Sequence, residues 1–154
     1  MRSTRLTLAT MIAMTTLGSA SEQKPADAKP APVSTIIKAA DLTAAFVKTK
    51  SFLETPEYRI STARREGPGD VEIHTVDTDI FYVVEGTANV VLGGEIVEPK
   101  TVSNNEIRGT SIRGGETKTL SAGDMIIIPN TVPHWFNEVS KAPFVYLVVK
   151  STSR

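Results

Sequence analysis

The sequence has no cysteine and only two histidines, His74 and His134, among its 154 residues. Without cysteine there is no disulfide framework, no thiolate zinc site, no thiol nucleophile and no iron–sulfur cluster. With so few histidines, any imidazole-based site must use one or both of them. These absences narrow the possible chemistry to nitrogen and oxygen groups.

An excess of charge of either sign is also missing, because 17 Lys and Arg residues balance 17 Asp and Glu residues. A chain without a basic excess is a poor candidate for binding nucleic acid through phosphates, so we expect no nucleic-acid partner. With 40% hydrophobic residues the chain is not a disordered polyelectrolyte. Its length fits a single domain of roughly 100–150 residues.

Two common catalytic and binding motifs are absent as well. The G-x-S-x-G pattern of serine hydrolases does not occur, and the glycine-rich turns such as Gly93-Gly94 precede no predicted helix, as a phosphate-binding loop requires. The glycines are therefore interpreted as β-turn residues.

Residues 1–20 have the pattern of a secretory signal peptide. Arg2 and Arg5 form a short positive region without a twin-arginine pair, an apolar run follows, and Gly18-Ser19-Ala20 offers a cleavage site. The alternative is a single N-terminal anchor helix, but the run is too short for a membrane span. The prediction is a secreted or periplasmic protein, with no stable membrane span after cleavage, a Pro/Ala/Lys-rich linker at 21–35 and a domain at 36–154.

The domain is predicted to be all-β after one short helix. Asp41 can cap that helix, whose apolar residues are Leu42, Ala45 and Phe46 and which ends before Pro56. Nine short β-branched or aromatic runs separated by turn residues are typical of a sandwich or barrel. They are 58–64, 71–76, 80–85, 87–92, 107–112, 117–120, 125–128, 134–139 and 144–149, with a polar connection at 98–106.

Two segments resemble the two sequence motifs of the cupin family. They are GDVEIHTVDTDIFYVVEG at 69–86 and AGDMIIIPNTVPHWFNEV at 122–139, and the resemblance covers about residues 57–150. In the first motif, Gly86 is in register with the closing glycine and His74 with the second histidine. Asp79 stands where the family has Glu, and Glu72 where it has the first histidine.

In the second motif, Gly123, Pro129 and His134 are in register, while Thr131 replaces the usual glycine. The resemblance implies a double-stranded β-helix (jelly-roll) barrel. It also implies that the family's metal-ligand set becomes Glu72, His74, Asp79 and His134 in this sequence.

The chemistry of these residues agrees with a metal site. Glu72 and His74 are two apart on a predicted strand, so they share a face. Two histidines with carboxylates suit iron(II), and also manganese, zinc or nickel, so we expect one divalent metal ion as cofactor. The alternatives are that Glu72 is a solvated strand residue and that Asp79 caps the start of its strand.

Several side chains are candidates for lining a ligand pocket, although each could instead belong to the core or to the surface. Aromatic side chains line pockets but more often fill cores, and arginines anchor carboxylates but more often face solvent. The candidates are Tyr82, Trp135, Phe136 and Arg108, followed by Tyr58, Arg64 and Arg113.

Two functions remain open from the sequence. The first is a cupin that binds one divalent metal and a small polar molecule, and acts as a metal-dependent dioxygenase, isomerase or lyase. The second is a non-catalytic module of the cell envelope that binds a sugar or another small molecule, or is purely structural. The fold does not choose between them. The apolar segment Phe144–Val149 suggests a homodimer through an outer sheet.

Overall fold

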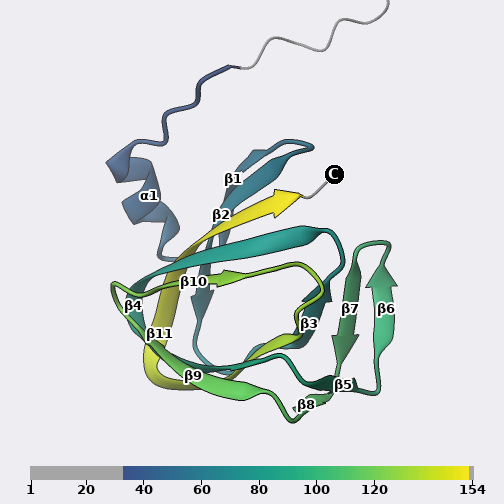
Figure 1. Cartoon of the computed structure of the whole chain (residues 1–154). Coiled ribbons are helices and arrows are strands. Elements are labelled where there is room, and N and C mark those ends of the chain that lie inside the picture. The colour runs from purple at the N-terminus through teal and green to yellow at the C-terminus, as the bar shows by residue number, and fades with distance from the viewer. Residues whose placement is uncertain (1–32, 153–154) are drawn as a thin grey trace, which may run out of the picture. The chain divides into compact units, whose positions relative to one another are not determined.

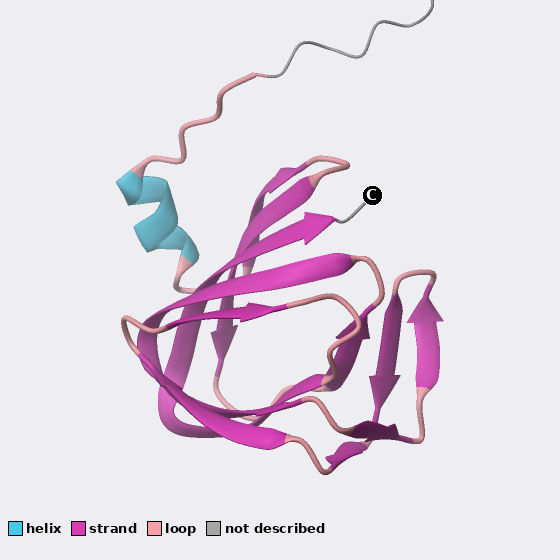
Figure 2. Cartoon of the chain, viewed as in Figure 1, coloured by secondary structure: helices cyan, strands magenta, loops and turns pink. Residues whose placement is uncertain are grey.

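The computed structural model describes residues 33–152; the chain divides at residue 35, and its second unit spans 36–154. The predicted signal peptide and almost all of the predicted linker lie outside the described residues. The second unit consists of strands and one short helix, which confirms the predicted all-β class (Figure 2). Within residues 33–152, no helix is both long enough and apolar enough to cross a membrane.

The helix, α1, spans Ala39–Ala45 and ends before Pro56 as expected, but its N-cap differs from the prediction. Lys38 is the N-cap and makes no side-chain capping hydrogen bond, whereas Asp41 lies inside the first turn. A carboxylate there still interacts favourably with the helix dipole. The Oγ1 of Thr62 donates to the carbonyl of Ala45 at 3.1 Å, which ties the end of the helix to the sheet.

Eleven strands follow in the described residues. They are β1 (Lys50–Glu54), β2 (Tyr58–Arg65), β3 (Val71–His74), β4 (Asp77–Leu92), β5 (Glu95–Val97), β6 (Lys100–Ser103), β7 (Glu106–Gly109), β8 (Ser111–Arg113), β9 (Glu116–Ser121), β10 (Met125–Ile128) and β11 (His134–Thr152). One sheet has the order β1-β2-β11-β3-β7-β6, and β4 pairs with β9, β10 and β11, while β5 and β8 form a small sheet of their own. Figure 1 shows the long strands β4 and β11 wrapping with the others around a common interior, which is the predicted barrel.

Three differences from the predicted strands have local causes. β4 runs through the expected turn at Gly86, and β11 runs through the expected break at 140–143, because irregular register absorbs both bends. The predicted strand 107–112 is divided between β7 and β8, and the predicted connection 98–106 contains β6. Strand β1 was not predicted, because its sequence KSFLE contains no β-branched residue.

The long strand β11 is a central element of the sheet. Its segment Phe144–Val149 pairs with β2 on one side and with β4 on the other. The segment therefore offers no free edge for the homodimer that the sequence suggested. Homodimerisation itself stays a prediction.

The core lies inside the barrel, on the inward-facing positions of β4, β9, β10 and β11. Alternation of buried and exposed residues along β4 shows which face is inward. Phe81, Phe136, Phe144 and Tyr146 form a tilted aromatic cluster with ring centroids 5.1–5.8 Å apart. The buried members of the core are Phe81, Val83, Ala88, Val90, Leu120, Ile128, Phe136, Phe144, Tyr146 and Val148.

Candidate metal centre

Strand pairing brings His134 beside Glu72 and His74, which lie about 60 positions earlier in the sequence. In the antiparallel ladder of β3 and β11, His134 lies directly opposite Glu72. Directly opposed residues project to the same face of a sheet, and His74, two positions after Glu72, projects there too. The predicted shared face of Glu72 and His74 therefore also contains His134.

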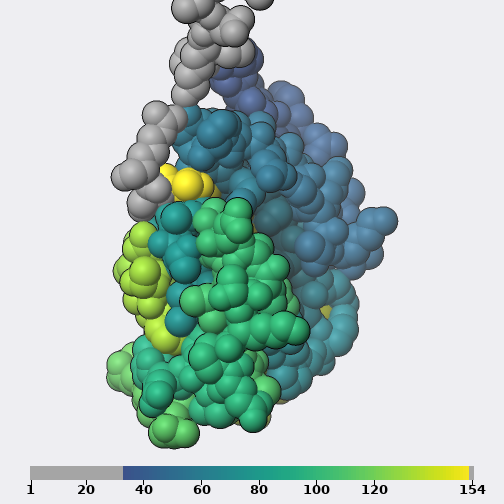
Figure 3. Space-filling view, turned by 90° about the vertical axis from the view of Figure 1, so that its right-hand side faces the viewer, coloured from purple at the N-terminus to yellow at the C-terminus, as the bar shows by residue number. Residues whose placement is uncertain are grey.

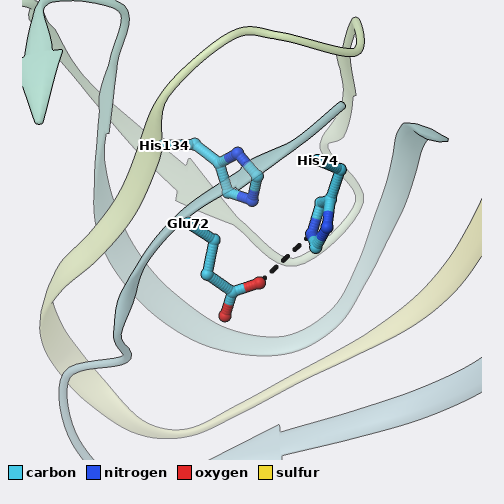
Figure 4. Close-up of side chains that lie close together, drawn as sticks. All are labelled: Glu72, His74 and His134. Atoms are coloured by element: carbon cyan, nitrogen blue, oxygen red, sulfur yellow. Dashed lines mark ion pairs between the residues drawn. The ribbon is translucent and has the colours of Figure 1, made fainter. Parts of the chain in front are cut away.

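The three side chains converge inside the barrel (Figure 4). One ligand atom from each of Glu72, His74 and His134 lies within 4.8 Å of the others. The Nε2 of His74 is 3.2 Å from the Oε2 of Glu72, and the two imidazole rings are 5.4 Å apart between centroids. Both histidines are buried, and Glu72 is half-buried with 19% of its side chain exposed. This arrangement of two imidazoles and one carboxylate could hold a divalent cation.

A backbone contact orients His134 for ligation. The Nδ1 of His134 lies 3.2 Å from the carbonyl oxygen of Val132. Since a carbonyl only accepts hydrogen bonds, this contact places the proton on Nδ1 and leaves the lone pair of Nε2 facing the interior. Metal-bound histidines are commonly held in this way by a carbonyl at the second nitrogen.

Asp79 lies beside this group from strand β4. Its Oδ2 is 3.4 Å from the Nε2 of His74 and 3.6 Å from the Nε2 of His134. This oxygen is buried and accepts no hydrogen bond within the described residues. Several acceptor atoms thus converge on one space with too few donors between them, which is the condition that a bound cation would relieve. The residues therefore fit a metal ion.

Lys150 is a further charged residue at this centre, and sequence reasoning did not single it out. It lies opposite Asp79 in the ladder of β4 and β11. Its Nζ is 2.7 Å from the Oδ1 of Asp79 and 2.8 Å from the Nε2 of His74. An ammonium group only donates, so Lys150 and a metal ion compete for the same lone pair of His74.

The electrostatic environment favours ionised Glu72 and neutral His134. Burial alone would raise the pKa of Glu72, but the hydrogen bond with His74 and the charges of His134, His74 and Arg108 outweigh it and lower the pKa to about 2. Burial is also the main cause that lowers the pKa of His134 below its usual value.

Two cavities adjoin the centre. The inner cavity, of about 140 Å³, is lined by Arg65, Glu72, Asp79, His134, Phe136 and Tyr146, among others. The outer cavity, of about 370 Å³, is lined by residues of β1, β2, β6 and β7 together with His74, Asp77 and Lys150. In Figure 3 the hairpin of β6 and β7 (green) stands beside the segment of β1 and β2 (blue), and the outer cavity lies where these regions meet. Lys150 lines both cavities, whereas His74 lines only the outer one.

The predicted pocket-lining residues are placed differently from one another. Phe136 is buried and lines the inner cavity. Trp135 points the other way and donates from Nε1 to the carbonyl of Gly69 at 2.9 Å. Tyr82 is 43% exposed on the outer face, because even-numbered positions of β4 project outward there. Arg108 pairs with Glu106 and Asp70 and lines neither of the two cavities described above.

The other candidates from the sequence lie mainly at the surface. Tyr58 is 40% exposed. Arg64 pairs with Glu66 at 2.8 Å, and Arg113 pairs with Glu95 at 3.4 Å with most of its side chain in solvent. The arginine that enters the inner cavity is Arg65, the immediate neighbour of Arg64. Strand alternation could have separated the two arginines if the inward face of β2 had been known.

The loop before β11 is held against the centre by its backbone. The N–H of Thr131 donates to the carbonyl of His74 at 2.7 Å. Thr131 has a φ of 65°, a conformation that glycine adopts readily and a β-branched residue does not. The observed φ explains why a glycine in this second motif would be the unstrained choice.

A family model described as the cupin domain matches residues 108–150. The domain has the cupin fold. The matched residues include His134 and Lys150, whereas Glu72, His74 and Asp79 precede them and are brought to the same place by the strand pairing.

Solved structures show the same fold at low sequence identity. Against KdgF from Halomonas sp. the TM-score is 0.50 with 21% identity, over 69% of this chain and 78% of that one. Against BH2720 from Bacillus halodurans the TM-score is 0.55 with 16% identity, over 80% of this chain and 84% of that one. Against a conserved protein with a double-stranded β-helix domain from Klebsiella pneumoniae the TM-score is 0.50 with 18% identity, over 70% of this chain and 75% of that one. None of the curated proteins matches this chain.

Proposed function

We propose that this chain binds one divalent metal ion through Glu72, His74 and His134, with Asp79 beside them, and a small polar molecule on that ion. The observation that supports the metal is the convergence of three ligand atoms within 4.8 Å of one another. Three protein ligands leave coordination positions open, and the inner cavity offers room beside them. When bound, the ion would supply Lewis-acid or oxygen-activating chemistry for a dioxygenase, isomerase or lyase reaction.

The donor set limits the choice of metal. Two imidazoles and one or two carboxylates are nitrogen and oxygen ligands, and the chain has no cysteine. Iron(II), manganese, zinc and nickel accept such a set, whereas copper(I) prefers thiolates. We therefore propose one of these four ions.

Metal analysis of the purified protein tests the proposal. The protein is incubated with each of the four ions and the excess is removed. Inductively coupled plasma mass spectrometry should then find about one equivalent of at least one of the ions per chain. His74→Ala and His134→Ala should each lower the retained metal by tenfold or more, because each removes a ligand. Glu72→Gln should lower it as well, and Glu95→Gln, an exposed glutamate 73% in solvent, is the matched control.

Two results would contradict the proposal. Wild-type protein that retains none of the ions refutes the metal site. Metal that stays bound in both histidine variants refutes the ligand assignment. Circular dichroism of each variant separates loss of a ligand from loss of the fold.

One observation favours a second function, a binding module that needs no metal. The Lys150 ammonium already contacts His74 and Asp79 and so supplies a positive charge to the centre. In this function the module holds a small molecule in the cell envelope and catalyses no reaction. Ligand binding that is equal with and without metal would favour it over the first function.

We also propose that the chain is exported, from the pattern of residues 1–20. Expression of the full chain in a bacterial host should yield a periplasmic protein whose N-terminus lies near Ser21. A protein recovered from the cytoplasm with residues 1–20 intact would contradict export.

A further inference from the structure

Arg65 is held rigidly at the wall of the inner cavity. Its Nε donates to the Oη of Tyr146 at 2.8 Å, and its guanidinium carbon lies 5.4 Å from the centroid of the Phe136 ring. On the remaining side Gly69 packs so closely that a Cβ there would be 2.4 Å from the Nη1 of Arg65. A guanidinium fixed in this way has lost its side-chain entropy before any ligand arrives.

This guanidinium has no carboxylate partner within residues 33–152. The other four arginines of that range each form an ion pair with an aspartate or glutamate. Arg65 lies instead against a tyrosine and a phenylalanine, although Glu72 and Asp79 line the same cavity. A half-buried arginine without a counter-ion is unusual, because its charge is partly desolvated without compensation.

The charged residues around the inner cavity indicate what kind of ligand would compensate the charge of Arg65. Arg65 and Lys150 contribute two positive charges, and Glu72 and Asp79 two negative charges, so these four sum to zero. Asp70, which also lines the cavity, is paired with Arg108. A divalent ion at the centre would leave a surplus of two positive charges, and an anionic ligand would neutralise it.

We propose that the inner cavity binds a small organic acid whose carboxylate pairs with Arg65 while a second oxygen of the acid faces the Glu72–His74–His134 centre. This inference rests on the proposed function and names the class of its ligand. The planar guanidinium matches a carboxylate with two parallel hydrogen bonds. The Tyr146 hydroxyl, whose oxygen accepts from Arg65, still has its own proton to donate.

The size of the cavity limits the acid. A volume of about 140 Å³ corresponds to roughly five water molecules at about 30 Å³ each in liquid water. Acids of two to four carbons with a hydroxyl or keto oxygen are of this size. A larger acid would exceed this volume.

Calorimetric titration with glycolate, lactate and pyruvate tests the proposal on the metal-loaded and on the metal-free protein. At least one acid should bind, and lactamide, which lacks the negative charge, should bind tenfold more weakly or not at all. Arg65→Gln should weaken binding of the acid by roughly tenfold or more while metal content stays unchanged. Arg64→Gln is the matched control, because the adjacent Arg64 pairs with Glu66 and lines neither cavity.

A second variant leaves Arg65 in place. Gly69→Ala should displace the guanidinium, because the new Cβ would collide with its Nη1, and should weaken binding severalfold. Equal binding of lactate and lactamide, or acid binding that is unchanged in Arg65→Gln, would overturn the inference. So would a metal-loaded protein that binds none of the acids, and that result leaves the metal proposal intact. If the protein retained none of the four ions after incubation and still bound an acid in an Arg65-dependent way, the metal proposal would be refuted and the acid site would stand.

Discussion

At the scale of single residues, Lys150 supplies the positive charge that faces Asp79 when no metal is bound. Its ammonium contacts buried Asp79, which is 1% exposed, and His74. Lys150→Met should leave that carboxylate unpaired and lower the free energy of unfolding of the metal-free protein by about 3 kcal/mol. The variant should also gain more stability from added metal than wild type does, because the ion replaces the lost charge and meets no competing ammonium.

Thermal unfolding with chelator and with each candidate ion measures both effects. Lys118→Met is the control, since Lys118 is half-exposed and pairs with exposed Glu116. Surface pairs contribute little, so its melting temperature should stay near that of wild type under both conditions. A metal-induced shift in Lys150→Met equal to or smaller than that of wild type would show that Lys150 does not compete with the ion.

The residues that the sequence identified and those it missed differ in one physical respect. Glu72 and His74 share a face through strand periodicity, and the motif spacing related them to His134. Lys150 and Arg65 face the same interior through strand register, Lys150 opposite Asp79 and Arg65 beside Tyr146. Register depends on how distant strands pair, and a single sequence contains no direct signal for it.

At the scale of elements, Gly86 allows the two longest strands to bend together. It has a φ of 83°, and a Cβ there would lie 2.2 Å from the carbonyl oxygen of Pro143 and 2.5 Å from that of Lys141. Gly86→Ala should therefore lower the free energy of unfolding by about 3 kcal/mol, through backbone strain and overpacking together. Urea unfolding measures the loss.

Two other glycines separate these causes. Gly93 has a φ of 72° but open space around its Cβ position, so Gly93→Ala should cost about 1 kcal/mol from strain alone. Gly67 has open space and no positive φ, so Gly67→Ala should cause no loss. If all three variants lost the same stability, the close approach at Gly86 would not be what fixes the bend.

The elements themselves were predictable where β-branched residues alternate between turn residues. The strand Met125–Ile128 agrees with the prediction at both ends, and β2 differs by one residue. The joined strands β4 and β11 were not predictable, because Gly86 indicates a turn in most contexts and here lets the backbone of β11 approach closely. Whether Gly86 forms a turn or lies within a continuous strand is decided by residues 141–144, more than fifty positions away.

At the scale of the whole molecule, the balanced charge of the chain conceals buried groups whose ionisation depends on pH. The pKa of His134 is lowered, chiefly by burial, so the folded chain keeps this imidazole neutral where the unfolded chain protonates it. The unfolded state therefore binds more protons below about pH 6.5, and the free energy of unfolding falls with the pH. Glu72 acts at lower pH. Because its pKa is lowered to about 2 in the folded chain, the ionised carboxylate stabilises the fold above pH 4.5, and this contribution is lost as the pH falls towards 2.

Chemical unfolding of the metal-free protein between pH 7.5 and pH 3 should show these two windows in succession. The slope that His134 adds below pH 6.5 is at most about 1.4 kcal/mol per pH unit, since one proton is involved. His134→Gln should remove that slope and keep the lower window, and Glu72→Gln should remove the lower window and keep the upper one. Glu95→Gln removes an exposed carboxylate away from the centre and is the control for charge alone. If the His134 variant retained the full slope from pH 6.5, the acid sensitivity would arise outside the centre, and burial of a neutral imidazole could no longer explain it.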